Sequence, residues 1–204
     1  MVEIRNATQN DISEICNFHK RIFSDYYLSH LGYDVLYSYY NHFIMNPGSI
    51  TYIAINDNKV IGIALTVKDF ENTISKFYKS AKSLIIKGLI KGLFRLDKVI
   101  LKNTFSRISK ALFLKEDPVT NPKGYTLLSL AVDSSFQGKN ISQKLIENTE
   151  QDLSMLNQSN YYLSVLPGNL RAINFYKKIG FVVTRTTKNK TLMEKIFNRI
   201  ESYE

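Results

Sequence analysis

Residues 124–150 read GYTLLSLAVDSSFQGKNISQKLIENTE. The apolar run from Leu127 to Val132 has the length and composition of a buried strand. Asp133, Ser134 and Ser135 then end the run with residues typical of turns. Beyond Gly138 the spacing becomes helical, and one face collects Ile141, Leu145, Thr149, Leu153 and Leu156. A buried strand, a turn with a glycine and a helix start present free backbone N–H groups to an anion. We therefore expect this stretch to bind a pyrophosphate.

Length and composition indicate an ordinary globular protein. The chain has 204 residues, of which 44% are hydrophobic and 22% charged, so we expect one domain with a substantial core. It shows no secretory leader, and no apolar run approaches the ~18 residues of a membrane span. A single cysteine, Cys16, excludes an internal disulfide and fits a reducing compartment. We therefore expect a cytoplasmic protein.

The net charge of +9 is concentrated in one block. Residues 71–115 contain eleven Lys or Arg and two acids, whereas the remainder has 16 basic and 16 acidic residues. Such a block points to an anionic partner for this segment. Apolar residues recur within it at helical spacing, which predicts two basic amphipathic helices over about 70–115 with a bend near 93–97.

Three readings of the basic helices stay open. In the first reading their apolar face packs on the domain or on a second subunit of a homodimer. In the second reading it lies on an anionic membrane surface, peripherally at the inner membrane. In the third reading the lysines steer an anionic substrate. We do not expect nucleic acid as a partner.

The remaining pattern predicts an α/β fold of the α+β type. Asn56-Asp57-Asn58-Lys59 between two apolar alternating runs is a hairpin signal. The expected strands are 2–5, 50–55, 60–67, 161–166, 181–185 and 191–196, besides the central one. Three more helices are expected. The first is capped by Asn10 or Asp11, and the other two cover about 34–45 and 168–179.

Two segments resemble the GNAT superfamily of acyl-CoA-dependent N-acyltransferases. The segment 132–142 is similar to the family's pyrophosphate loop, in which Gln or Arg precedes x-x-Gly-x-Gly/Ala. Asn169-x-x-Ala172-x-x-Phe175-Tyr176-x-x-x-Gly180-Phe181 is similar to its later acyl-CoA motif at every key position. The strong likeness covers residues 125–196; residues 1–67 are compatible, and 70–115 have no counterpart in the minimal fold.

The resemblance implies a single domain over 1–204, with a mixed, mostly antiparallel sheet flanked by helices. The basic segment would be an insertion between the third and fourth strands. It implies an N-acetyltransferase with acetyl-CoA as cosubstrate and no metal. Carried over by motif, the catalytic residues are Tyr176 and Asn169. The implied cofactor-binding residues are Leu130, Ala131, Val132, Gln137, Gly138, Lys139, Asn140, Ile141, Ser142, Asn169, Ala172 and Tyr176.

The loop departs from the family pattern at two positions. Asn140 and Ser142 stand where the family usually has Gly and then Gly or Ala, residues that let the backbone approach the pyrophosphate closely. We expect helical dihedral angles at both positions, so that neither residue strains the chain. Each side chain can also donate a hydrogen bond to phosphate.

The implied reaction is direct attack of an amine on the acetyl thioester in a ternary complex. The backbone N–H near Val132 is the candidate donor to the thioester oxygen, and Tyr176 is the candidate acid for the departing thiolate. Asn169 and Tyr176, seven residues apart, are expected on one helix face. The central strand carries no acid, so the base is unassigned, with His30 as a candidate. His19, His30 and His42 lack metal-ligand spacing.

The acceptor is expected to be a small primary amine, with an amino sugar or sugar nucleotide favoured over a peptide. This preference rests on the basic segment and on a concentration of tyrosines over residues 26–40, which can stack on a ring or simply pack the helices. The alternative function is an acyl-CoA-binding module with weakened catalysis. It would dock on membrane or nucleic acid through its basic helices.

Overall fold

The computed structural model describes residues 1–102 and 123–196, and they form two compact units. The sheet unit comprises residues 1–7, 47–70 and 123–196. The helical unit comprises residues 8–46 and 71–102. The predicted single domain and the predicted status of the basic segment as an insertion both remain predictions.

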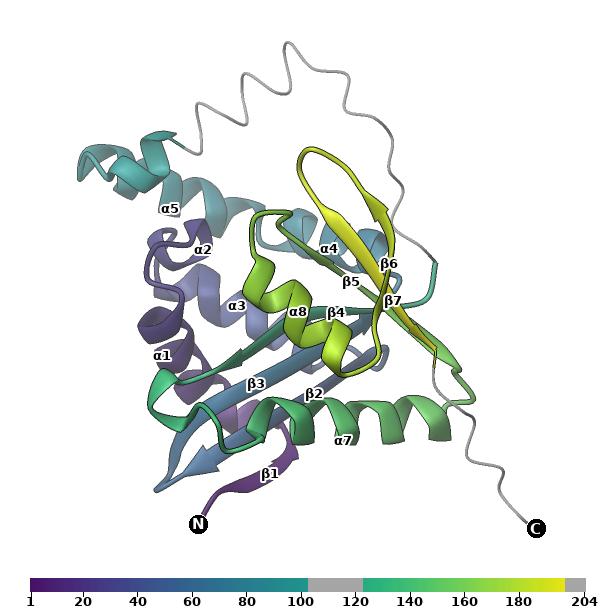
Figure 1. The fold of residues 1–204 in the computed structure, drawn as a ribbon. Coiled ribbons are helices and arrows are strands. Elements are labelled where there is room, and N and C mark those ends of the chain that lie inside the picture. Colours follow the sequence, from purple (N-terminus) through teal and green to yellow (C-terminus); the bar gives the residue numbers. More distant parts are fainter. Residues whose placement is uncertain (103–122, 197–204) are drawn as a thin grey trace. The chain divides into compact units, whose positions relative to one another are not determined.

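The sheet unit is built on seven strands in the order β1-β2-β3-β4-β5-β7-β6 (Figure 1). Their bounds are β1 Glu3–Asn6, β2 Ser49–Asn56, β3 Lys59–Lys68, β4 Tyr125–Val132, β5 Asn160–Val165, β6 Val182–Thr186 and β7 Thr191–Ile196. All neighbouring pairs are antiparallel except β4 and β5, which are parallel. The predicted α/β class with a mostly antiparallel sheet is confirmed.

The predicted hairpin joins β2 to β3. Asp57 and Asn58 have φ of 49° and 61°. Two consecutive left-handed residues form the turn that matches the twist of the flanking strands, and Asn and Asp tolerate this conformation.

Strand β4 contains an irregularity and then separates from β5. Its register with β3 pairs Leu127 with Thr66 but Ser129 with Leu65, so Leu128 is an extra residue, a β-bulge. The parallel pairing with β5 is limited to Thr126↔Tyr162 and Leu127↔Leu163. The second half of β4 therefore has a hydrogen-bonding edge that β5 does not cover.

Helices α7 (Ile141–Met155) and α8 (Leu170–Lys178) lie in front of the sheet in Figure 1. The predicted apolar face of α7 is buried from Ile141 to Leu153, and Thr149 is buried with its hydroxyl donating to the carbonyl of Leu145. Leu156 was also expected on that face, but it is 50% exposed because the helix ends at Met155. The core beneath these helices includes Tyr52, Leu127, Tyr161, Leu163, Phe181 and Met193.

The helical unit contains the helices α1 to α5, and α3 contacts each of the other four. Their bounds are α1 Ile12–Ile22, α2 Tyr27–His30, α3 Tyr33–Ile44, α4 Phe70–Ser80 (whose first residue belongs to the sheet unit) and α5 Lys82–Phe94. Helix α3 contacts α1, α2 and α5. It meets α4 through the edge-to-face rings of Tyr39 and Phe77, and through a hydrogen bond from His42 to the carbonyl of Thr73. The short helix α2 was not expected from the sequence.

Helices form where the basic amphipathic helices were expected, but the first of the two expected helices is divided, because α4 ends at Ser80 and α5 begins at Lys82. The chain bends after α5, where Leu96 has φ of 52°, and a further helical turn follows over 98–102. The predicted bend near 93–97 is thus confirmed, and residues 103–115 lie outside the described part. Over 1–102 and 123–196, no helix combines the length and apolar character needed to cross a membrane.

Candidate active site

The open edge of β4 presents backbone N–H groups. The N–H of Asp133 donates to the carbonyl of Ile61 on β3 at 2.8 Å. Because successive residues of a strand direct their N–H groups to alternate edges, Ala131 faces β3 whereas Leu130 and Val132 face the other edge. That is the edge from which β5 has separated. Two of the residues expected to bind the cofactor therefore direct their N–H groups toward an edge that no described strand pairs with.

The loop after β4 is exposed and ends at the start of α7. Asp133 fixes its first turn, because its Oδ1 accepts from the N–H and the hydroxyl of Ser135 at 3.0 and 2.7 Å. Residues 137–140 are all exposed, and Gly138 has φ of 80° with no described atom within 4 Å of where a Cβ would lie. Buried Ile141 anchors the first turn of α7.

Asn140 is the N-cap of α7 and adopts the left-handed conformation, with φ of 57° and ψ of 16°. The expectation of helical dihedral angles at Asn140 was therefore wrong, while Ser142 does lie inside the helix. The physical reason is that the chain leaves an extended Gln137 and must reverse sharply to enter α7. Apart from Gly, Asn is among the residues that adopt this conformation most readily, so it can replace the family's glycine.

The first turn of α7 has no side-chain cap within the described residues. The Asn140 side chain makes no capping hydrogen bond. The first N–H groups of a helix have no partner inside the helix and carry a partial positive charge. They are therefore available to an anion, and pyrophosphate binding by this loop stays a prediction. The Lys139 ammonium, 4.7 Å from the centre of the Phe136 ring, adds a positive charge nearby.

Asn169 is the N-cap of α8. Its Oδ1 accepts from the N–H of Ala172 at 3.1 Å, a capping interaction that stabilises the start of a helix. The Asn169 side chain turns back to cap the helix, so its position on one helix face with Tyr176 stays a prediction. Its catalytic and cofactor-binding roles remain predictions. Of the two polar atoms of its side chain, Oδ1 already has a structural role in capping the helix.

A hydrogen bond joins the two segments that resemble the family motifs. Arg171, in the first turn of α8, donates from Nη2 to Oε1 of Gln137 at 2.8 Å. Both residues are exposed, so the guanidinium lies at the surface beside the anion loop. Sequence reasoning missed Arg171, although a cation between two predicted cofactor-binding residues, Asn169 and Ala172, was a usable signal.

Tyr176 is partly buried and packs against the core of the sheet unit. Its ring centre is 5.4 Å from that of Phe175 and 5.5 Å from that of Phe181, both in edge-to-face geometry. Burial raises the pKa of its hydroxyl to about 12. The phenol is therefore protonated throughout the physiological range and can act as a proton donor.

An ion pair that sequence reasoning missed lies close to this aromatic cluster. Lys195 contacts both carboxylate oxygens of Glu150, at 2.6 and 2.9 Å, and Tyr161 donates to Oε1 of Glu150 at 2.7 Å. Burial, with the nearby Glu150 charge, strongly raises the pKa of Tyr161. The Tyr161 ring meets Phe181 at 5.0 Å, so this network supports the residue against which Tyr176 packs.

The histidines take structural positions in the helical unit. His19 is buried, its Nδ1 is 2.8 Å from the Tyr40 hydroxyl, and burial lowers its pKa to about 4. His30 Nδ1 is 2.7 Å from Oδ2 of Asp97. Burial alone would raise the pKa of Asp97, but hydrogen bonds from His30 and two backbone N–H groups, with the His30 charge, lower it. In the part of the chain described, no three metal-ligating side chains cluster.

The tyrosines of residues 26–40 differ in their exposure, from buried through partly buried to exposed. Tyr40 is buried, and burial raises the pKa of both Tyr39 and Tyr40, so these two pack the helices. Tyr26 and Tyr33 are 60% and 40% exposed. Cys16 belongs to the core, where it is fully buried, and burial raises its pKa to about 12.

Comparisons with known proteins agree with this geometry. A family model described as "Acetyltransferase (GNAT) family" matches residues 12–181. No curated protein sequence matches the chain.

Several solved structures share the fold at low sequence identity. PaiA N-acetyltransferase from Thermoplasma acidophilum in complex with coenzyme A is 15% identical, with 97% of this chain and 99% of that chain covered and a TM-score of 0.55. The ribosomal-protein-S18-alanine N-acetyltransferase from Escherichia coli is 14% identical, with 100% and 99% covered and a TM-score of 0.56. Aminoglycoside 6'-N-acetyltransferase AAC(6')-Ih from Acinetobacter baumannii is 10% identical, with 92% and 95% covered and a TM-score of 0.58.

Proposed function

Because the chain belongs to the GNAT family of acetyltransferases, we propose that it transfers the acetyl group of acetyl-CoA to the primary amine of a small molecule. Acetyl-CoA is the family's cosubstrate, so the proposal concerns the acceptor, the residue roles and direct attack in a ternary complex. The observation that supports it best is the Arg171–Gln137 hydrogen bond, which brings the anion loop and α8 together.

The pyrophosphate of CoA is assigned to the loop 137–142. Exposed N–H groups at the start of α7, with Lys139 and Arg171 as nearby cations, give this loop the chemistry of an anion site. The left-handed Asn140 lets the backbone turn as glycine would. The altered loop therefore no longer favours the alternative of a binding module with weakened catalysis.

The thioester is assigned to the gap between β4 and β5. As the amine attacks, the carbonyl oxygen gains negative charge and needs a donor already in position. The N–H groups of Leu130 and Val132 on the open edge of β4 supply such donors without rearrangement, because no described strand pairs with that part of the edge.

Tyr176 is assigned the role of general acid toward the departing CoA thiolate. As the amine forms the new C–N bond, the C–S bond of the thioester breaks. The O–H bond of the phenol breaks with it, its proton moves to sulfur, and the phenolate regains a proton from solvent. A pKa of about 12 keeps Tyr176 protonated at neutral pH, so its O–H is present to donate to the sulfur as the C–S bond breaks.

The group that removes the proton from the amine stays unassigned. A free alkyl amine has a pKa of about 10.4, so at neutral pH it must lose a proton before attack. When the His30 ring is neutral, its hydrogen bond to Asp97 places the proton on Nδ1 and leaves the lone pair on Nε2. His30 Nε2 is buried and has no hydrogen-bond partner among the described residues. His30 stays a candidate on this chemistry alone.

An amino sugar or an amine-bearing sugar nucleotide is the favoured acceptor. Exposed Tyr26 and Tyr33 can stack on a sugar ring, and the basic segment attracts an anionic diphosphate. Of the tyrosines that suggested this preference, Tyr39 and Tyr40 no longer contribute, because they pack the helices.

The test is release of free CoA thiol from acetyl-CoA over a panel of amines. The panel contains free amino sugars, amine-bearing sugar nucleotides, polyamines and short peptides with a free N-terminus. We expect amine-dependent thiol release that is fastest with the amino sugars or their nucleotides. Release that is fastest with peptides would overturn the acceptor class, and calorimetric binding of CoA without release on any amine would overturn the acceptor proposal as a whole.

A further inference from the structure

Helix α5 has two apolar stripes, and only one of them is covered within the helical unit. Leu84, Ile85 and Leu89 pack against the cluster of Leu31, Val35 and Ile100. Two glycines fix this contact: a Cβ on Gly88 would lie 2.2 Å from the carbonyl oxygen of Leu31, and one on Gly92 would lie 2.7 Å from Ile100. The inward face of α5 is therefore set by close backbone approach.

The second stripe is exposed. Ile86, Ile90, Leu93 and Phe94 are 45%, 48%, 44% and 86% exposed, and their spacing of four, three and one residues places them on one side of the helix. Leu96 (75% exposed) and Leu101 (40%) add two exposed apolar side chains just after the helix. We call these six residues the α5 patch. Apolar side chains exposed together in this way indicate an interaction surface.

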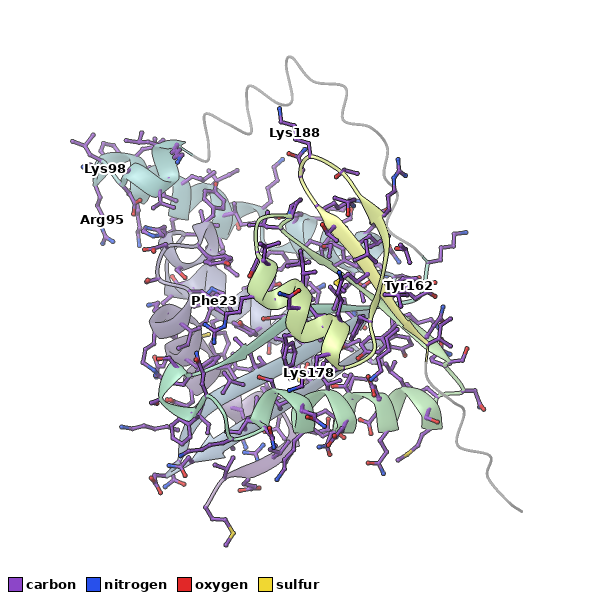
Figure 2. The ribbon with its side chains drawn as sticks, in the orientation of Figure 1. Phe23, Arg95, Lys98, Tyr162, Lys178 and Lys188 are labelled. Carbon is purple, nitrogen blue, oxygen red and sulfur yellow. The ribbon has the colours of Figure 1, made fainter. Side chains whose placement is uncertain are left out.

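Cations border the patch. Residues 82–102 contain six Lys or Arg and one acid, a net charge of +5. The acid is Asp97, whose Oδ2 is bonded to His30 and whose Oδ1 accepts from the N–H groups of Val99 and Ile100. All six cations are exposed, and the side chains of Arg95 and Lys98 extend from the turn that follows α5 (Figure 2).

We propose that the α5 patch docks the protein on a membrane surface that contains anionic lipids. The apolar side chains would enter the interface between headgroups and acyl chains, while the flanking lysines reach the phosphates. Long lysine side chains suit this position because their methylene stems can lie along apolar surface while the ammonium stays at the headgroups. This inference does not depend on the acceptor or on the residue roles proposed above.

The charge argues against a second copy of the chain as the occupant. In a two-fold symmetric dimer the same patch faces itself, so a net charge of +5 would meet a net charge of +5. Protein interfaces are also depleted in lysine, whereas Lys82, Lys87 and Lys91 border the stripe. Anionic lipid complements both features of the patch at once.

Vesicle co-sedimentation of the full chain tests the proposal. At ~10 mM salt, where the screening length is about 30 Å, we expect binding to mixed phosphatidylcholine and phosphatidylglycerol vesicles and little binding to phosphatidylcholine alone. Neutralising two cations in Lys87→Gln with Lys91→Gln should weaken binding about 25-fold, because each cation contributes about fivefold. The matched control is Lys59→Gln with Lys188→Gln, which should bind like the wild type.

A second variant tests the apolar contribution. Phe94→Glu should abolish binding, and the control Met155→Glu, at a position 66% exposed on α7, should weaken it far less. Circular dichroism and thermal unfolding check that each variant is folded. Absence of binding to anionic vesicles, or equal binding by the Lys87/Lys91 pair and its control, would overturn the proposal. Sedimentation that instead reveals a dimer lost in Phe94→Glu would assign the patch to a second copy and would also overturn it.

Discussion

Asn140 provides a direct test of the anion loop, because its left-handed backbone makes substitutions there predictable. Its φ of 57° and ψ of 16° are readily accessible to Gly and tolerated by Asn. They are costly for most other residues, because the Cβ atom lies too close to the following carbonyl oxygen. Asn140→Ala should therefore cost about 1 kcal/mol wherever the loop keeps this conformation. Asn140→Gly removes the strain but loosens the unfolded chain, two effects of similar size and opposite sign.

The cost of Asn140→Ala is divided between stability and CoA affinity. If the free loop keeps its shape, the melting temperature should fall by about 2–4 °C, the shift expected per kcal/mol for a chain of this size. If the free loop relaxes, CoA affinity should fall by up to about fivefold, the factor that corresponds to 1 kcal/mol. Asn140→Gly should bind CoA as tightly as the wild type or more tightly.

Titration calorimetry with CoA and thermal unfolding of the same preparations measure both quantities. Ser142→Ala is the control, because Ser142 lies in a regular helical turn. An Asn140→Ala protein unchanged in both stability and affinity would refute the role given to the left-handed residue. An Asn140→Gly protein that loses CoA affinity would show that the Asn side chain is itself a ligand.

Three further predictions follow from neighbouring contacts. Tyr176→Phe should leave CoA binding unchanged and slow turnover by ~10²–10⁴-fold. In the wild type, ionisation of Tyr176 should cause no loss of rate up to about pH 10, because the pKa of Tyr176 is about 12. Glu150→Ala should destabilise the fold by about 3 kcal/mol, because it leaves the mostly buried Lys195 charge without its partner. Gly88→Ala should destabilise it by at least ~1–3 kcal/mol, because the new Cβ would lie 2.2 Å from the Leu31 carbonyl oxygen.

Each of these predictions has a matched comparison. Tyr78→Phe, at an exposed position on α4, should not slow turnover, and equal rates for the wild type and Tyr176→Phe would reduce Tyr176 to packing. Denaturant unfolding of Glu147→Ala, an exposed acid on the same helix, should change stability far less than Glu150→Ala. Gly168→Ala meets no described atom within 4 Å, so a loss of stability equal to that of Gly88→Ala would contradict the clash argument.

Local signals in the sequence predicted most of the fold. The hairpin at 56–59 could be predicted because Asp and Asn tolerate left-handed angles, and the strand–turn–helix over 125–155 because its apolar period changes from strand to helix. The conformation of Asn140 could not be predicted, because it depends on the direction in which the loop must enter α7. A single polar residue at a helix start carries no signal of that direction.

The parts of the site that were missed depend on contacts between distant positions. Arg171 and Gln137 are 34 residues apart, and Lys195 and Glu150 are 45 apart. Each looks like an ordinary surface charge or polar residue in the sequence, because no local period links the two partners. Helix α5 also depends on such contacts. The sequence indicated one apolar face, but the close contacts of Gly88 and Gly92 reveal which of two apolar stripes is covered.

The order of substrate binding tests the central claim of direct attack most directly. With the best amine of the panel, initial rates of thiol release are measured as acetyl-CoA is varied at several fixed amine concentrations. A ternary complex held by the loop 137–142 and the β4 edge predicts double-reciprocal lines that intersect. Parallel lines, together with acetylated protein recovered after incubation with acetyl-CoA alone, would reveal an acetyl-enzyme intermediate and contradict direct attack.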